Sequence, residues 1–407
     1  MAPSFLAQLE KGDKYSSIIK SLISYLVNNS ASTIPELAKE LGISVPTVTK
    51  VVNELTTVGL IAEYGQVEGH SGRRPVLYGF NRQSGYFLGL DVKRDYINVA
   101  IVDFMGEIVD IEMGHPLEEG MSANDTIEEI CDFVNEFIDE AIIPRDKIYY
   151  GCVALSGRVN SNTGFSFSTL SSPEQALNDI FSERLNIPIC IDNDSRVMTY
   201  GEYLCGKLAK SEKEVLYVNL SWGLGMGLII NGQIVKGRSG YAGEIGHFPA
   251  YNNEIMCHCG KKGCLETGIS GMALMREVVS SIKAGKQSLL CEKMLAEGDE
   301  SLTLIDIINA VDNDDMLCID VVENMSKELG RWLAGLINIF NPELVIIGGT
   351  LALLGDYLLR PVKQSVQKYT LRLVSQDSRI VVSKLAEKAG VLGAALYARH
   401  TILFENN

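Results

Sequence analysis

Hydrophobic residues recur at helical spacing through the first 60 positions of the chain. Residues 14–28 carry an apolar stripe that predicts a first amphipathic helix. Thr33, with a glutamate three positions later, forms a capping-box pattern for a second helix, which we expect to end at Gly42. Ser44 is expected to cap a third helix over residues 45–58. Two short helices joined by a tight glycine-containing turn are typical of a helix-turn-helix.

A β-hairpin is predicted after the third helix. Residues 60–64 and 76–80 have the composition of strands, and Arg73 and Arg74 lie beside glycine and proline in the loop between them. Three helices alone would also fit a plain helical subdomain, but a following hairpin is the wing of a winged helix. Adjacent arginines on a flexible loop suit phosphates or a narrow minor groove. We therefore predict a winged helix over residues 1–82 that binds operator DNA. The residues expected to contact DNA are Ser44, Thr47, Thr49, Lys50, Asn53, Arg73 and Arg74.

From residue 86 the pattern changes to short strands alternating with helices. Three strands, a helix, a strand, another strand and a helix are predicted in turn, and a similar order starts again at Glu214. The repetition predicts a duplicated α/β domain with lobes at 83–210 and 211–407. We expect a ligand cleft between the lobes and a C-terminal helix that packs back on the first lobe.

The charge of the chain is unevenly distributed. Its 407 residues should form two or three domains and carry a formal net charge of −15, which disfavours a general nucleic-acid-binding surface. Residues 1–85 have a balance of +1, whereas the remainder has −16. DNA contact must therefore come from locally placed charges. With so few of them one copy should bind weakly, which favours a homodimer or homotetramer.

The spacing of the cysteines indicates the cellular compartment of the protein. The nine cysteines are mostly isolated in sequence, which favours a reducing cytoplasm. No basic and apolar leader occupies residues 1–20, and no apolar run has membrane length. We therefore expect a cytoplasmic protein without membrane association.

Three of the cysteines fall within eight positions. They are Cys257, Cys259 and Cys264, with Gly260 and Gly263 between the last two, and positive-φ turns at those glycines would let the sulfurs converge. His247 lies ten residues before the first of them, so we predict a Cys3His site for structural Zn²⁺ with no open position for water. His258 is a competing fourth ligand, although between two ligating cysteines its side chain should point away. Reduced thiols in a glycine-rich loop are the alternative.

Two carboxylates flank this cluster. Glu244 precedes His247 by three residues, and Glu266 follows Cys264 by two. A bound metal would hold both carboxylates on rigid loops and orient the histidine ring. Such acceptors suit a ligand rich in hydroxyl groups.

The same stretch resembles the signature of the ROK family (repressor, open reading frame, kinase). The matching segments are Gly-Glu-Ile-Gly-His at 243–247 and Cys-His-Cys-Gly-Lys-Lys-Gly-Cys-Leu-Glu at 257–266, and the likeness extends over nearly the whole chain. It implies an actin-like ATPase (hexokinase-like, RNase H-like) fold and the zinc ligands His247, Cys257, Cys259 and Cys264. It also implies sugar contacts at Asn193, Asp194, Glu244, His247 and Glu266, with Asp194 as the general base of the family's kinases.

Two segments depart from the kinase pattern. Family kinases carry Asp-x-Gly-Gly-Thr after the first strand, where glycine backbone meets ATP phosphate, but here the segment is Asp91-Val92-Lys93-Arg94-Asp95. Kinases also tend to have Pro-Asn-Leu near residues 165–170, where this chain has no asparagine. The glycines at 348–349 resemble the adenosine turn, although strand-to-helix turns of this fold need glycine regardless. We therefore predict a protein that is not an enzyme, with Asp194 as a vestigial base.

Together these features predict a sugar-responsive transcriptional repressor. The partners would be operator DNA and a sugar or sugar derivative that weakens operator binding by population shift. Two rival hypotheses stay open: a sugar kinase that also carries a DNA-binding domain, and a repressor controlled by a protein partner.

Overall fold

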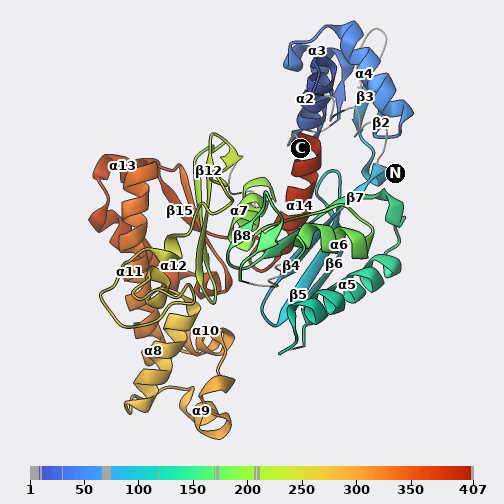
Figure 1. The fold of residues 1–407 in the computed structure, drawn as a ribbon. Helices are drawn as coiled ribbons and strands as arrows, with labels where there is room; N and C mark the ends of the chain where they lie inside the picture. Colours follow the sequence, from blue (N-terminus) through green and yellow to red (C-terminus); the bar gives the residue numbers. More distant parts are fainter. Residues whose placement is uncertain are drawn as a thin grey trace. The chain divides into compact units, whose positions relative to one another are not determined.

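The chain forms two compact units. The computed structural model describes residues 9, 12–29, 31–66, 75–118, 120–168, 170, 174–205, 208 and 211–404. Unit 1 comprises Met1–Asp192 and Ala394–Asn407, and unit 2 comprises Asn193–Gly393. Figure 1 follows the elements along the chain by colour. The division falls once at Asp192 and once inside the last helix, so unit 1 is built from two separate stretches of sequence.

The first part of unit 1 is a winged helix. Its elements are α2 (Lys14–Asn28), β1 (Ser32–Thr33), α3 (Ile34–Leu41), α4 (Val45–Thr57), β2 (Ile61–Gln66) and β3 (Val76–Phe80). The predicted capping box is present, since the backbone N–H of Thr33 donates to the Glu36 carboxylate at 2.8 Å and the Thr33 hydroxyl accepts from the Glu36 N–H at 3.4 Å. The strands pair in the order β1-β3-β2. The wing tip with Arg73 and Arg74 lies outside the described residues.

One element in this region was not predicted from the sequence, and one local prediction is wrong. Ser32 begins β1 and pairs with Tyr78, and a strand of two residues is too short to show alternation in the sequence. Ser44 stands at the N-cap position of α4, but its side chain makes no capping hydrogen bond. Its hydroxyl instead lies 2.7 Å from the Thr47 hydroxyl, a second short polar side chain that competes for it.

The rest of unit 1 is a five-stranded sheet covered by helices. Its elements are η1 (Arg82–Ser84), β4 (Tyr86–Val92), β5 (Tyr96–Asp103), β6 (Ile108–Pro116), α5 (Ala123–Glu140), η2 (Arg145–Lys147), β7 (Ile148–Leu155), β8 (Val159–Asn160), β9 (Phe165–Ser166), α6 (Leu177–Leu185) and β10 (Ile189–Asn193). The sheet order is β10-β7-β4-β5-β6, with β4 antiparallel to β5 and parallel to β7. Every residue of β4 is buried, as expected of a central strand with both faces covered.

Unit 2 repeats this arrangement. Its elements are α7 (Asp194–Cys205), β11 (Val215–Leu220), β12 (Leu224–Ile230), β13 (Gln233–Ile234), η3 (Ile245–His247), η4 (Leu265–Thr267), α8 (Gly271–Lys283), α9 (Cys291–Glu297), η5 (Asp299–Ser301), α10 (Leu304–Asp312), α11 (Met316–Phe340), β14 (Leu344–Gly348), η6 (Thr350–Leu354), α12 (Asp356–Tyr369), α13 (Arg372–Asp377), β15 (Arg379–Val382) and the start of α14 (Lys388–Phe404). The sheet order β13-β12-β11-β14-β15 is that of unit 1 written from the other edge. In both, three consecutive strands form an antiparallel meander, and the fourth lies parallel to the first. This shared order confirms the predicted duplication.

Long amphipathic helices were easier to predict than short ones. The long, uninterrupted apolar stripe of residues 316–340 predicts a helix with the bounds of α11, which spans 25 residues. Helices α9 and α13, with seven and six residues, are too short to show such a stripe in the sequence, and α13 buries none of its residues. None of the described helices combines the length and apolarity needed to cross a membrane.

Candidate functional site

Asn193 and Asp194 lie where β10 ends and α7 begins. Their exposed fractions are only 9% and 8%. Oδ1 of Asn193 accepts from the backbone N–H groups of Ser195 at 3.1 Å and Arg196 at 3.3 Å. Oδ1 of Asp194 accepts from the Ser195 N–H at 2.7 Å. Helix N-termini present unpaired N–H groups that favour such acceptors, so the first turn of α7 holds both side chains in place.

A chain of polar side chains continues from Asp194 into the sheet of unit 2. The Ser195 hydroxyl donates to Asp194 at 3.2 Å and accepts from the Asn219 amide at 3.1 Å. The Ser221 hydroxyl donates to Asn219 at 2.9 Å and accepts from the backbone N–H of Thr350 at 3.1 Å. Sequence reasoning missed this network. A buried asparagine inside the apolar strand β11 was the signal that could have found it, because buried amides need partners.

The loop that carries Glu244 lies tightly against β12. A Cβ atom at Gly243, whose φ is +94°, would lie 2.2 Å from the carbonyl oxygen of Met226. One at Gly246 would lie 2.4 Å from that of Leu224. Only glycine permits this approach, which lets η3 position the side chains on either side of it.

Three of the predicted sugar contacts meet at this loop. Nε2 of His247 lies 3.6 Å from the Glu244 carboxylate, and Nδ1 of His247 lies 3.7 Å from the Glu266 carboxylate. The side chains of Glu244 and His247 are 35% and 29% exposed, and that of Glu266 is 11% exposed. Two carboxylates and an imidazole thus form a partly accessible polar group. All five predicted sugar contacts belong to unit 2.

The predicted metal ligands converge. The side-chain donor atoms of His247, Cys257, Cys259 and Cys264 all lie within 4.8 Å of one another. Tetrahedral zinc with bonds of about 2.0–2.3 Å separates its ligand atoms by roughly 3.8 Å, so the spacing fits such an ion. The glycines between the cysteines have the expected positive φ, 82° at Gly260 and 71° at Gly263. His258 is exposed and lies outside this group.

The sulfur of Cys257 lies close to the carboxylate of Glu266. Sγ of Cys257 donates to Oε1 of Glu266 at 2.8 Å and lies 3.5 Å from Nδ1 of His247. Burial, reinforced by this carboxylate, raises the pKa of the Cys257 thiol. A metal must displace that proton, because the thiolate is the ligand.

Helix α4 has the two faces expected of a helix that reads DNA. Its buried residues are Val48, Val51, Val52 and Leu55. Ser44, Lys50 and Asn53 are exposed, and Thr47 and Thr49 are partly exposed. Lys50 is held in place, since its ammonium lies 5.1 Å from the centre of the Tyr15 ring and 3.9 Å from the Glu54 carboxylate.

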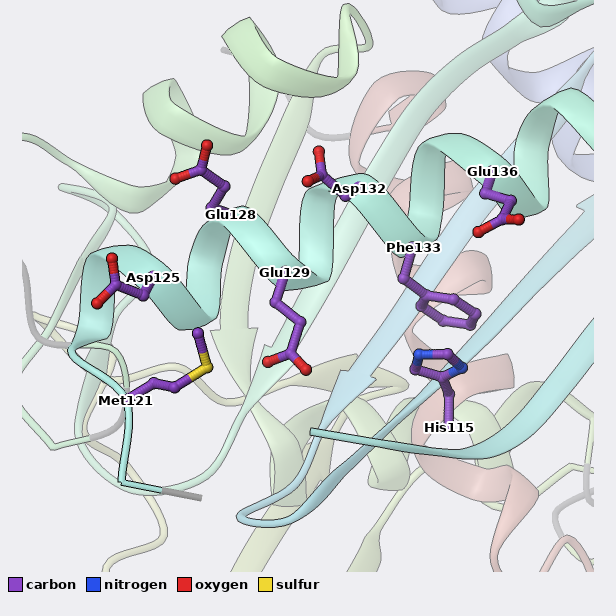
Figure 2. A pocket seen from close by; sticks show the side chains of 8 residues that line it. All are labelled: His115, Met121, Asp125, Glu128, Glu129, Asp132, Phe133 and Glu136. Carbon is purple, nitrogen blue, oxygen red and sulfur yellow. The ribbon is translucent and has the colours of Figure 1, made fainter. Parts of the chain in front are cut away.

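A hollow of unit 1 lies apart from all of these predicted site residues. It has a volume of about 550 Å³ and lies over α5, where the His115 ring stacks on Phe133 at a centroid distance of 3.6 Å. Figure 2 shows the side chains that line it. Carboxylates from three turns of the helix surround it. They are Asp125, Glu128, Glu129, Asp132 and Glu136. Such a lining repels phosphate groups, and none of the predicted site residues belongs to it.

Comparison with known proteins identifies the lineage. A model described as "ROK family" matches residues 87–401, and one described as "Winged helix-turn-helix DNA-binding" matches residues 16–62. The chain belongs to the ROK family. It is 29% identical to the xylose repressor of Bacillus subtilis (strain 168) over 379 residues, which cover 92% of each chain. It is also 30% identical to a glucokinase of Halalkalibacterium halodurans over 312 residues, 76% of this chain and 93% of that one.

The fold agrees with solved ROK structures. A crystal structure titled as a ROK family transcriptional regulator, homologue of the E. coli MLC protein, matches with a TM-score of 0.80 at 26% identity. The match covers 95% of this chain and 96% of that chain. The predicted fold class, a winged helix followed by a duplicated actin-like ROK domain, is thereby confirmed.

The segment that departs from the ROK kinase pattern is filled by side chains. Nζ of Lys93 lies 2.8 Å from Oδ1 of Asp91, which is buried at the end of β4. The Asn98 amide donates to the other carboxylate oxygen at 3.2 Å. A lysine paired with a buried carboxylate therefore occupies position 93 of this segment.

The glycine turn after β14 has a packing role of its own in this ROK chain. A Cβ atom at Gly348 would lie 1.9 Å from the Tyr217 hydroxyl, and one at Gly349 would lie 2.5 Å from that of Ser221. Both glycines are therefore required by neighbouring side chains of unit 2. Their presence is therefore no evidence that the chain binds a nucleotide.

Proposed function

We propose that this ROK protein is a sugar-responsive transcriptional repressor. The observation that carries the proposal is that one chain joins a winged helix-turn-helix to a ROK domain and aligns with 92% of a relative named xylose repressor. The winged helix binds operator DNA. A sugar or sugar derivative in unit 2 shifts the protein toward a state with lower operator affinity.

Operator recognition falls to α4. Lys50 and Asn53 reach base edges in the major groove, with Thr47 and Thr49 beside them and Ser44 near phosphate. Ordering of Lys50 by Tyr15 and Glu54 limits the entropy lost on binding. Because residues 1–85 carry a net charge of only +1, useful affinity requires paired copies, as a homodimer or homotetramer. Arg73 and Arg74 contribute phosphate contacts.

The five predicted sugar contacts of unit 2 recognise the sugar. The carboxylates of Asp194, Glu244 and Glu266 accept hydrogen bonds from sugar hydroxyls, and Asn193 and His247 supply further polar contacts. Buried acceptors discriminate strongly, because a ligand that lacks the matching hydroxyl leaves them unpaired. The backbone and side-chain bonds to Asn193 and Asp194 preorganise this part of the site.

The cysteine cluster is proposed as a structural Zn²⁺ site. His247, Cys257, Cys259 and Cys264 would hold the ion, whose closed shell supplies rigidity rather than a reactive water. Glu244 and Glu266 lie within three residues of ligands, so the same shell orients both carboxylates.

We propose that the chain does not phosphorylate its sugar. Lys93 and Arg94 replace the glycines at which kinase backbone meets phosphate, and Lys93 is engaged by Asp91. The similarity to a glucokinase keeps the rival kinase function in view. ATP-dependent turnover of a hexose by the purified protein would establish that rival instead.

Operator binding tests the proposal directly. The purified protein is titrated onto DNA from upstream of its own and neighbouring genes, with D-xylose, D-glucose, N-acetyl-D-glucosamine and their phosphates in turn. Release by one of these compounds is the expected result. Tight DNA binding that none of them changes would contradict the sugar response and favour a protein partner as the signal.

A further inference from the structure

Helix α14 belongs to both units of the protein. It runs without interruption from Lys388 to Phe404, and the boundary between the units falls within it, after Gly393. One continuous helix thus takes part in the packing of unit 2 at its start and of unit 1 at its end. The contacts at the two ends of α14 determine which displacements it can pass from one unit to the other.

At its start, α14 is fitted closely to α7, the helix that begins with Asp194. A Cβ atom at Gly201 of α7 would lie 2.7 Å from the Ala389 carbonyl oxygen. One at Gly393 of α14 would lie 2.2 Å from the Val197 carbonyl oxygen. The two backbones therefore touch with no side chain between them. Interfaces of this kind shift as blocks rather than deform.

A buried carboxylate ties the same two elements together. Glu202 of α7 has no exposed surface. Its Oε1 accepts from the Leu385 N–H at 2.8 Å and from the Ser383 hydroxyl, both in the segment that leads into α14. Displacement of α7 therefore carries the first turn of α14 with it, because breaking these bonds would leave a buried charge unsatisfied.

At its other end, α14 holds the turn between β5 and β6. Nη1 of the buried Arg399 donates to the Phe104 carbonyl oxygen at 2.7 Å. Leu396 and Arg399 also close over Gly106, where a Cβ atom would lie 2.8 Å from Leu396. Helix α14 therefore contacts this turn through both a hydrogen bond and close packing.

Phe104 leads from that turn to the winged helix. Its ring is fully buried and stacks on Phe80, the last residue of β3, with a centroid distance of 5.4 Å and an interplanar angle of 9°. Tyr149 packs its ring edge on Phe104 at 6.0 Å and donates its hydroxyl to the Ser84 carbonyl, just after the winged helix. A shift of the turn therefore acts on the base of the wing.

We infer that α14 couples the sugar site to the DNA-binding domain, through Glu202 and Ser383 at one end and Arg399, Phe104 and Phe80 at the other. The inference rests on the proposed function and specifies its regulation. Ligand contact at Asp194 displaces α7, and α14 conveys the displacement to β3. The coupling is a free energy shared by the two sites, so each ligand changes the affinity of the other by the same factor.

The test measures this factor in both directions. Operator affinity is determined with and without the sugar that releases the wild-type protein, from D-xylose, D-glucose and N-acetyl-D-glucosamine. Affinity for that sugar is determined by calorimetry with and without the operator duplex. The variants are Arg399→Met, which removes the donor to Phe104, and Ser383→Ala, which removes a donor to Glu202. Arg145→Met is the matched control, since Arg145 also donates to backbone carbonyls of unit 1 but away from α14.

The Arg399→Met and Ser383→Ala variants should retain each affinity measured alone to within about threefold, while the coupling factor falls at least about fivefold. Arg399→Lys, which keeps a cationic donor, should retain more of the factor than Arg399→Met. A wild-type protein with no sugar response overturns the proposed function and this inference with it. A wild-type response that persists unchanged in both variants overturns the inference alone. If Arg399→Met fails to fold, the coupling factor of Ser383→Ala, which loses only one hydroxyl, tests the inference.

Discussion

The ammonium of Lys93 neutralises the carboxylate of Asp91 at a distance of 2.8 Å, at the end of a strand whose every residue is buried. The lysine side chain itself is 21% exposed, so the pair is shielded from most of the solvent. An ion pair in such a place contributes little net stability while intact, but removing one partner strands the other charge.

The first prediction concerns that pair. Lys93→Met should lower the free energy of unfolding by about 3–5 kcal/mol, because Asp91 would keep a buried charge with no cation beside it. Urea unfolding measures the difference. Arg94→Met, a change at an exposed neighbour, should stay within about 0.5 kcal/mol of wild type. A double variant with Asp91→Asn should recover most of the loss, and no recovery would contradict this explanation.

The second prediction concerns the metal ligands. Cys259→Ser should abolish stoichiometric zinc in the purified protein and destabilise unit 2 by about 3–5 kcal/mol, because loss of a metal removes the links between its loops. Elemental analysis and thermal unfolding measure both effects. His258→Ala is the matched control and should keep the metal, since His258 lies outside the ligand group. Loss of zinc in the control would reverse the assignment of the fourth ligand.

The third prediction separates sugar sensing from DNA binding. Glu244→Ala should leave operator affinity within about twofold of wild type and weaken the sugar response at least about tenfold, because a hydroxyl partner is lost. Glu254→Ala removes an exposed carboxylate of the same loop region and should change neither quantity. Loss of operator binding by a folded Glu244→Ala protein would count against a purely sensory role for this residue.

The fourth prediction is a pH dependence at Asp103, the residue before Phe104. Burial raises the pKa of its carboxyl, although backbone N–H groups of Met105 and Glu107 donate to it. A raised folded pKa means that the protonated form is favoured by folding, so this contribution is full below the unfolded pKa of about 3.9 and is lost as pH rises through the folded value.

Asp103→Asn keeps an acceptor for both N–H groups without the charge. It should therefore be at least as stable as wild type at pH 7, and its advantage should vanish below about pH 4. Arg82 lies 4.0 Å away but is 61% exposed, so the ion pair that the variant loses is weak. Urea unfolding across this pH range provides the measurement. A variant that loses stability at pH 7 but not at low pH would show that the Arg82 pair outweighs burial.

Local spacing accounts for what could be predicted. Cys257, Cys259, Cys264 and His247 are close in sequence, so their convergence follows from loop length and glycine turns. The repeated strand order and the capping box at Thr33 are also patterns of neighbouring residues. Predictions based on such patterns need no knowledge of tertiary contacts.

The features that could not be predicted from the sequence depend on contacts between residues far apart in the chain. The bond from Asn219 to Ser195 spans 24 positions, and that from Arg399 to Phe104 spans 295. Nothing in the neighbourhood of either residue identifies its partner. The same holds for β1, whose two residues form a strand only because β3 passes beside them.

The split of unit 1 between two stretches of sequence has a consequence for synthesis. Residues 394–407 emerge from the ribosome after all of unit 2, and they include Arg399 and Leu396, which contact the turn at Phe104. The winged helix is translated first, but the unit that supports it is finished last. A nascent or prematurely terminated chain therefore lacks the completed base of its DNA-binding domain, so full support of operator binding is reserved for chains that already contain the whole sensor.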